Sequence, residues 1–126
     1  MHTLTITTAG QVKVDDWPGE DALLAHLYAE IGCQLVTPVD LGVYLTMWCD
    51  DEGLLADEAC INEQATKLAG VFGQLSSYLV GTVVVTARSD AEGHTRPLSP
   101  GMVAALRRTL GTLKALPLRL PDSWGA

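Results

Sequence analysis

The chain has 126 residues, of which 48% are hydrophobic and 18% are charged. This length and composition fit one globular domain that can bury a core without a metal or a disulfide, and they exclude a disordered chain. The formal net charge of −7 argues against direct nucleic-acid binding, because a protein that holds phosphates needs a basic surface.

The charge is divided unevenly along the chain. Residues 1–66 hold twelve acidic side chains and one basic side chain, Lys13, whereas residues 67–126 hold seven basic and three acidic side chains. The formal charges of the two parts are therefore −11 and +4. We expect the acidic part to face a basic partner, or the basic part of a second copy in a homodimer.

The first third of the chain predicts a β-hairpin followed by a helix. Polar and apolar side chains alternate over residues 3–7 and 12–14, on either side of a turn at Ala9-Gly10. Carboxylates at 20 and 21 are typical of a first helical turn, and Gly32 is a natural helix end. The apolar side chains at helical spacing between them are Leu23, Leu24, Leu27, Tyr28 and Ile31.

The middle of the chain predicts two strands, an acidic turn and a helix. We expect a short strand at 33–36, a turn at 38–42, and a longer strand at 43–49 that is apolar on both faces and therefore central in the sheet. A tight acidic turn follows at 50–53. Asn62 is expected to cap a helix over 63–72.

The last third predicts a strand at 81–87, a polar loop at 88–97 and a helix that Ser99 caps. Its apolar stripe is Val103, Leu106, Leu110 and Leu113. Residues 1–116 thus form a single α+β domain, and residues 117–126 form a C-terminal tail. The order ββαββαβα suggests a mixed or antiparallel sheet that packs on one face against two or three helices, with a ferredoxin-like arrangement as a candidate.

Several short motifs carry a family resemblance that covers most of the chain and is strongest from residue 41 to residue 99. They are Met47-Trp48, Asp51-Glu52-Gly53-Leu54, Asn62, Ala65-Thr66-Lys67-Leu68-Ala69, Phe72-Gly73, Gly81-Thr82-Val83-Val84 and Pro97-Leu98. With these motifs the chain resembles the family called domain of unknown function 3846, small proteins of bacterial and phage genomes. The resemblance implies a small cytoplasmic domain, often encoded on mobile DNA, and it transfers no catalytic residue.

No catalytic, cofactor-binding or metal-binding residue is predicted. Cys33, Cys49 and Cys60 are too widely spaced for a redox pair or a metal knuckle, so we expect them to be free thiols packed as small hydrophobic residues. The three histidines do not occur at metal-ligand spacing either. The acidic stretch after residue 49 fails the calcium-loop pattern, and turn chemistry accounts for it.

The expected function is therefore that of a non-enzymatic accessory protein of a phage or mobile element, acting through contact with an unidentified host or phage protein. One alternative is an acidic DNA mimic that blocks a DNA-binding protein, as antirestriction proteins do. Another is a small hydrolase or transferase that uses the acidic turn. The candidate partner-binding residues are Asp50, Asp51, Glu52, Asp57, Glu58, Arg107, Arg108 and Trp124.

The expected location is the cytoplasm of a bacterial host cell, with no membrane contact. The apolar runs have the length of strands and are too short to cross a bilayer. The N-terminal residues lack the basic start and long apolar stretch of a signal peptide.

Overall fold

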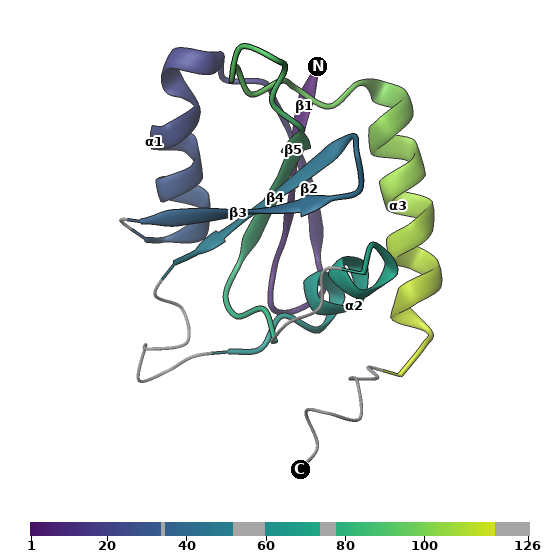
Figure 1. Ribbon diagram of the computed structural model, residues 1–126. Coiled ribbons are helices and arrows are strands. Elements are labelled where there is room, and N and C mark those ends of the chain that lie inside the picture. Colours follow the sequence, from purple (N-terminus) through teal and green to yellow (C-terminus); the bar gives the residue numbers. More distant parts are fainter. Residues whose placement is uncertain (34, 52–59, 74–77, 118–126) are drawn as a thin grey trace.

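A five-stranded antiparallel sheet forms the middle layer of the protein, and helices cover both of its faces (Figure 1). The computed structural model describes residues 1–33, 35–51, 60–73 and 78–117. In chain order the elements are β1 (His2–Ile6), β2 (Val12–Asp16), α1 (Glu20–Ile31), β3 (Val36–Leu41), β4 (Leu45–Asp50), α2 (Glu63–Val71), β5 (Val83–Ala87) and α3 (Pro100–Lys114). The predicted α+β class and the order ββαββαβα are confirmed.

The strands lie in the order β2-β1-β5-β4-β3, and every neighbouring pair is antiparallel. The middle position belongs to β5, whose five residues are all buried. The strand that we expected to be central, β4, is an interior strand between β5 and β3. Sequence pattern could not rank the two, because each strand carries apolar side chains on both faces.

The structure corrects the predicted turn at 38–42. Residues 36–41 form β3, which pairs with β4 along its whole length and places Pro38 opposite Trp48. Because β3 lies at the edge of the sheet, a proline there loses no ladder hydrogen bond if its nitrogen faces outward. The actual turn is at 42–44, and the strand expected at 33–36 begins only at its last residue.

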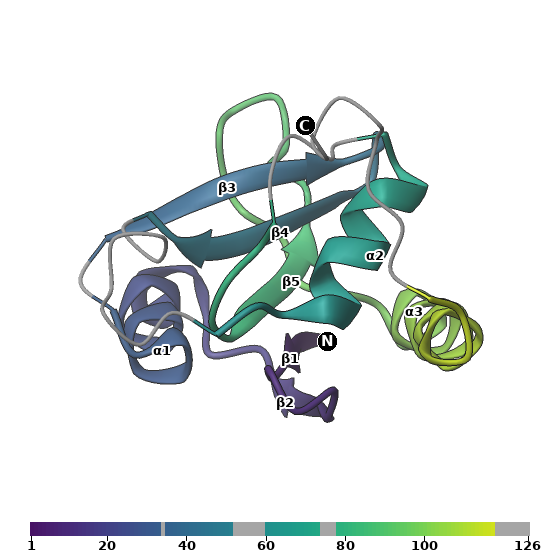
Figure 2. The same ribbon diagram turned by 90° about the horizontal axis from the view of Figure 1, so that it is seen from below.

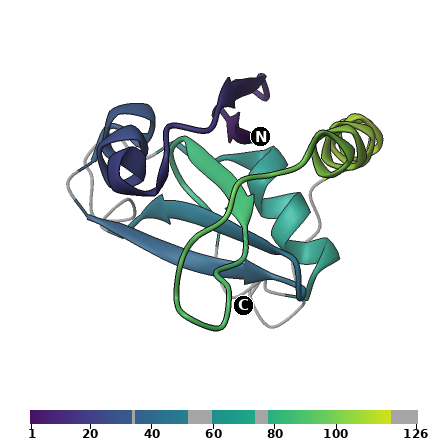
Figure 3. The same ribbon diagram turned by 90° about the horizontal axis from the view of Figure 1, so that it is seen from above.

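The two faces of the sheet pack against different helices. Leu4, Ile6, Met47 and Val85 face α2 and α3 in the larger core, whereas Val84 packs with Leu23 and Leu27 of α1 in the smaller one. Views from below and above show α1 on one side of the sheet and α3 on the other (Figures 2 and 3). The expectation of cover on one face is therefore wrong, and the arrangement is not ferredoxin-like. All five residues of β5 are buried, so this strand needs helices packed against both faces of the sheet.

The helix predictions are confirmed with one correction inside α1. Glycine at 32 ends α1 with a φ of 74°, a left-handed conformation that glycine adopts without strain. Leu23 and Leu27 are buried, but Leu24 is 51% exposed and does not belong to the buried stripe. None of the helices formed by the described residues has the length and apolar character needed to cross a membrane.

Asn62 caps α2 and also joins it to the sheet. Its Oδ1 accepts a hydrogen bond from the Ala65 backbone N–H at 3.0 Å. Its Nδ2 donates to the carbonyls of Ile6 at 3.0 Å and Gly81 at 2.9 Å. The Asn62 side chain is fully buried, so its amide depends on these protein partners and not on water.

We expect Asn62→Ala to lower the free energy of unfolding by about 2 to 4 kcal/mol, because it removes a helix cap and two hydrogen bonds to backbone carbonyls, of which the one to Ile6 is buried. The matched control is Ser99→Ala, which removes only the cap bond to Met102 N in α3 and should cost about 1 kcal/mol. Urea denaturation followed by circular dichroism measures both values. Equal losses in the two variants would show that Asn62 acts as a cap alone.

Candidate functional site

The structure does not gather the predicted partner-binding residues into one site. Asp50 ends β4 on the α1 side of the sheet, and Asp51 is exposed after it. Arg107 and Arg108 are exposed on α3, which covers the opposite face. Glu52, Asp57, Glu58 and Trp124 lie outside the described residues, as does most of the predicted tail, so their roles stay predictions.

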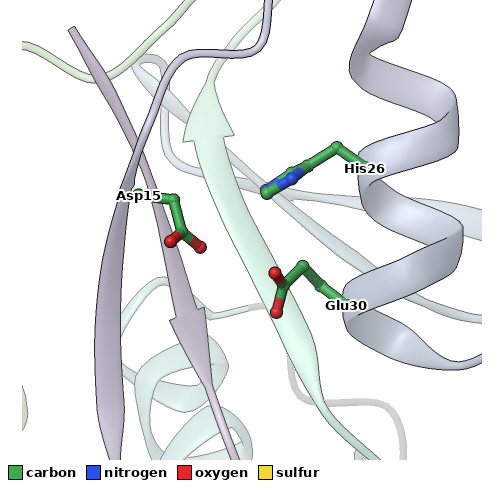
Figure 4. Close-up of side chains that lie close together, drawn as sticks. All are labelled: Asp15, His26 and Glu30. Atoms are coloured by element: carbon green, nitrogen blue, oxygen red, sulfur yellow. The ribbon is translucent and has the colours of Figure 1, made fainter.

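Five polar residues meet between the sheet and α1, and we call them the polar cluster: Thr3, Lys13, Asp15, His26 and Glu30. Strand alternation places Thr3 of β1 opposite Asp15 of β2 and directs both toward α1. The side chains of Asp15, His26 and Glu30 point toward one another from β2 and α1 (Figure 4). One potential ligand atom from each of these three lies within 4.8 Å of the others.

Short contacts hold the polar cluster together. Lys13 Nζ donates to both carboxylate oxygens of Glu30, at 2.9 and 3.1 Å, and lies 3.6 Å from Asp15 Oδ2. The hydrogen bond to Glu30 is the main cause that raises the pKa of Lys13, so its ammonium stays charged. His26 Nε2 lies 3.1 Å from the Thr3 hydroxyl. One positive charge thus lies between two carboxylates, beside an imidazole.

Sequence reasoning missed this cluster. It treated His26 as an isolated histidine, although Glu30 follows at i+4 on the same face of α1. That spacing was the one local signal. Asp15 and Thr3 join the pair only through the packing of α1 on the β1–β2 hairpin, and Thr3 is 23 residues away from His26.

An apolar groove of about 250 Å³ opens on the other face, between the β3–β4 turn, α2 and α3. Val43 and Tyr44 lie in the turn at its rim and are 70% and 71% exposed. We expected them to be strand residues, but they precede β4. The groove is lined by Leu41, Val43, Tyr44, Leu45, Leu68, Phe72, Met102, Ala105, Leu106 and Thr109.

Arg88 stabilises the β3–β4 turn, which contains the exposed rim residues Val43 and Tyr44. Its backbone N–H donates to the Tyr44 carbonyl at 2.8 Å, and its Nη1 donates to the Gly42 carbonyl at 3.2 Å. Gly42 has a φ of 65°, and a Cβ there would lie 3.1 Å from the Phe72 ring. Glycine is therefore needed both for the turn and for its close approach to α2.

The uneven charge along the sequence places acidic residues on α1 and basic residues on α3, on opposite faces of the sheet. Glu20, Asp21 and Glu30 are the charged residues of α1, which has no lysine or arginine. Arg107, Arg108 and Lys114 are the charged residues of α3, which has no carboxylate. Because these helices cover opposite faces of the sheet, the basic residues lie in the layer that also holds the groove, with Arg107 and Lys114 at a separate hollow beside Gly10 and Gln64, and an acidic helix borders the polar cluster.

The three cysteines differ in their surroundings, and the expectation that all pack as hydrophobic residues is wrong for Cys60. Cys49 is buried in the larger core and Cys33 is half-buried, but Cys60 is exposed. Burial raises the pKa of the Cys49 thiol to about 12, and burial followed by the charge of Asp50 raises the pKa of Cys33.

We expect iodoacetamide at pH 8 to alkylate Cys60 first, Cys33 more slowly and Cys49 only after unfolding. The thiolate is the reactive form, and a raised pKa lowers its fraction at that pH. Peptide mass spectrometry at timed intervals measures each rate, with the urea-unfolded chain as the control. Modification of Cys49 as fast as Cys60 in the folded chain would contradict the buried position of Cys49.

The comparisons agree with the sequence resemblance. The family model described as "Domain of unknown function (DUF3846)" matches residues 1–111. Neither the curated proteins nor the solved structures include a match to the chain. Since the family model covers most of the sequence, the chain belongs to the DUF3846 family.

Proposed function

We propose that the protein is a non-enzymatic accessory protein of a phage or mobile element that binds a host or phage protein through the apolar groove. The observation that carries the proposal is the exposure of Val43 and Tyr44 at the rim, at 70% and 71%. An aromatic and a branched aliphatic side chain exposed together beside an apolar hollow are typical of a protein interface.

The basic charge of α3 favours an acidic partner. Met102, Ala105 and Thr109 of α3 line the groove, and Arg107 and Arg108 lie on the exposed part of the same helix. A partner with an apolar side chain for the groove and an acidic surface that extends across the exposed part of α3 would complement both features. The basic charge would then favour association and orientation, and the apolar contact would supply affinity.

The test compares exposed apolar residues on opposite faces. Immobilised wild type, a Val43→Ala/Tyr44→Ala variant and a Leu24→Ala variant are used to capture proteins from a bacterial lysate, and each captured protein is then purified for titration. Leu24 is the matched control because it is also exposed but lies on α1. Melting temperatures of the three chains confirm that each remains folded.

We expect the double variant to bind the captured partner about tenfold or more weakly, because exposed aromatic anchors contribute much of the free energy of binding at interfaces. The Leu24→Ala variant should keep the affinity of the wild type. Replacing Arg107 and Arg108 by glutamate should slow association, most at low salt. If Leu24→Ala weakens binding as much as the double variant, the groove is not the interface.

A further inference from the structure

The polar cluster lies on the face of the sheet opposite the apolar groove, so the proposed protein contact does not explain it. It brings two carboxylates and one imidazole together, with a potential ligand atom of each within 4.8 Å of the others (Figure 4). Carboxylate oxygen and imidazole nitrogen are ligands for divalent first-row metal ions. The side chains come from β2 and α1, which hold them from two directions.

A second observation also points to a ligand. The hydroxyl of Thr5, a residue only 1% exposed, has no hydrogen-bond partner among the described residues. Thr5 lies two residues from Thr3 on the α1 side of β1, directly opposite Lys13. Asp15, whose side chain is 27% exposed, already has the Lys13 ammonium 3.6 Å from its Oδ2. The Thr5 oxygen can accept a hydrogen bond, and a metal-bound water molecule can donate one.

We propose that Asp15, His26 and Glu30 bind one divalent metal ion of the Mn²⁺ class, with water molecules completing its coordination. The carboxylates suit Mn²⁺, and the single imidazole distinguishes the site from the all-oxygen sites that Ca²⁺ and Mg²⁺ prefer. The Thr3 hydroxyl lies 3.1 Å from His26 Nε2 and can hold the ring as an outer partner when Nε2 donates to it and Nδ1 binds the ion. This proposal departs from the sequence-based prediction of no metal-binding residue, because the three ligands meet only in the folded chain.

The Lys13 ammonium competes with a metal ion for the carboxylates of Glu30 and Asp15. It contacts both oxygens of Glu30 and lies near Asp15, where it partly neutralises the charge that would attract a metal ion. The side chain is long and 54% exposed, so it can move into solvent when the ion binds. Removing the ammonium should therefore strengthen metal binding, and removing a ligand should weaken it.

The experiment measures Mn²⁺ binding to the full chain by electron paramagnetic resonance, in which the signal of the free ion falls on binding. Mn²⁺ is the probe because the accessible thiols of Cys33 and Cys60 would capture a softer ion such as Zn²⁺. The ligand variants are His26→Ala and Glu30→Gln, and the competitor variant is Lys13→Met. The matched control is His94→Ala, since His94 also lies near two carboxylates, 3.9 Å from Asp90 and from Glu92, but in an exposed loop.

We expect one Mn²⁺ per wild-type chain, about tenfold or more weaker binding in His26→Ala and Glu30→Gln, and about tenfold tighter binding in Lys13→Met. His94→Ala should bind as the wild type does. Circular dichroism reports the fold of each variant. If His26→Ala does not fold, the Mn²⁺ affinity of Glu30→Gln, which keeps the shape of the side chain, tests the site. The proposal is overturned if the wild type binds no Mn²⁺ at millimolar concentration, if only Lys13→Met binds it, or if His94→Ala loses it instead.

Discussion

The buried carboxamide of Asn62 is the contact on which the arrangement of the domain depends. It connects the first turn of α2 with the end of β1, 56 residues away, and with the segment that leads into β5. The Asn62 backbone continues the connection, because its N–H donates to Leu79 and its carbonyl accepts from Thr66. A fully buried amide has no water to replace a lost partner, so these bonds must form together.

The position of α2 in turn determines the shape of the apolar groove. Leu68 and Phe72 of this helix line the groove, and the Phe72 ring lies close against Gly42 of the β3–β4 turn. Thr66, one turn into α2, accepts a hydrogen bond from the Leu79 N–H and so repeats the link to the segment before β5. The exposed rim residues are therefore carried by a turn whose base is fixed by the core. Such a turn presents its side chains with little loss of conformational entropy on binding.

Local signals in the sequence were sufficient for the helices and for most strands. Asn62 and Ser99 cap the helices that they were expected to cap, and glycine ends α1 where predicted. β3 was missed because Pro38 and the glycine after β3 read as turn residues, and only pairing with β4 makes this stretch an edge strand. Whether a strand lies at the edge depends on the whole sheet, so the sequence of the segment alone cannot predict it.

The candidate sites were harder to predict for the same reason. The acidic turn was predicted as a partner-binding segment because its carboxylates are adjacent in sequence. The polar cluster instead joins residues from β1, β2 and α1. Of that cluster only the spacing of His26 and Glu30 could be recognised locally. The groove likewise combines residues from 41 to 109, and the exposure of its rim follows from where a turn falls.

The two faces of the sheet are suited to different chemistry because strand alternation sorts their side chains. The face under α2 and α3 is aliphatic, and its neighbouring surface holds the apolar groove. The face under α1 contains the buried threonines of β1 and β5, whose hydroxyls need partners. Trp48 Nε1 donates to Thr86 at 3.0 Å, and the His26 ring lies against Thr3. Among the described residues the Thr5 hydroxyl has no such partner, and the metal site that we propose on this face would lie apart from a protein bound in the groove.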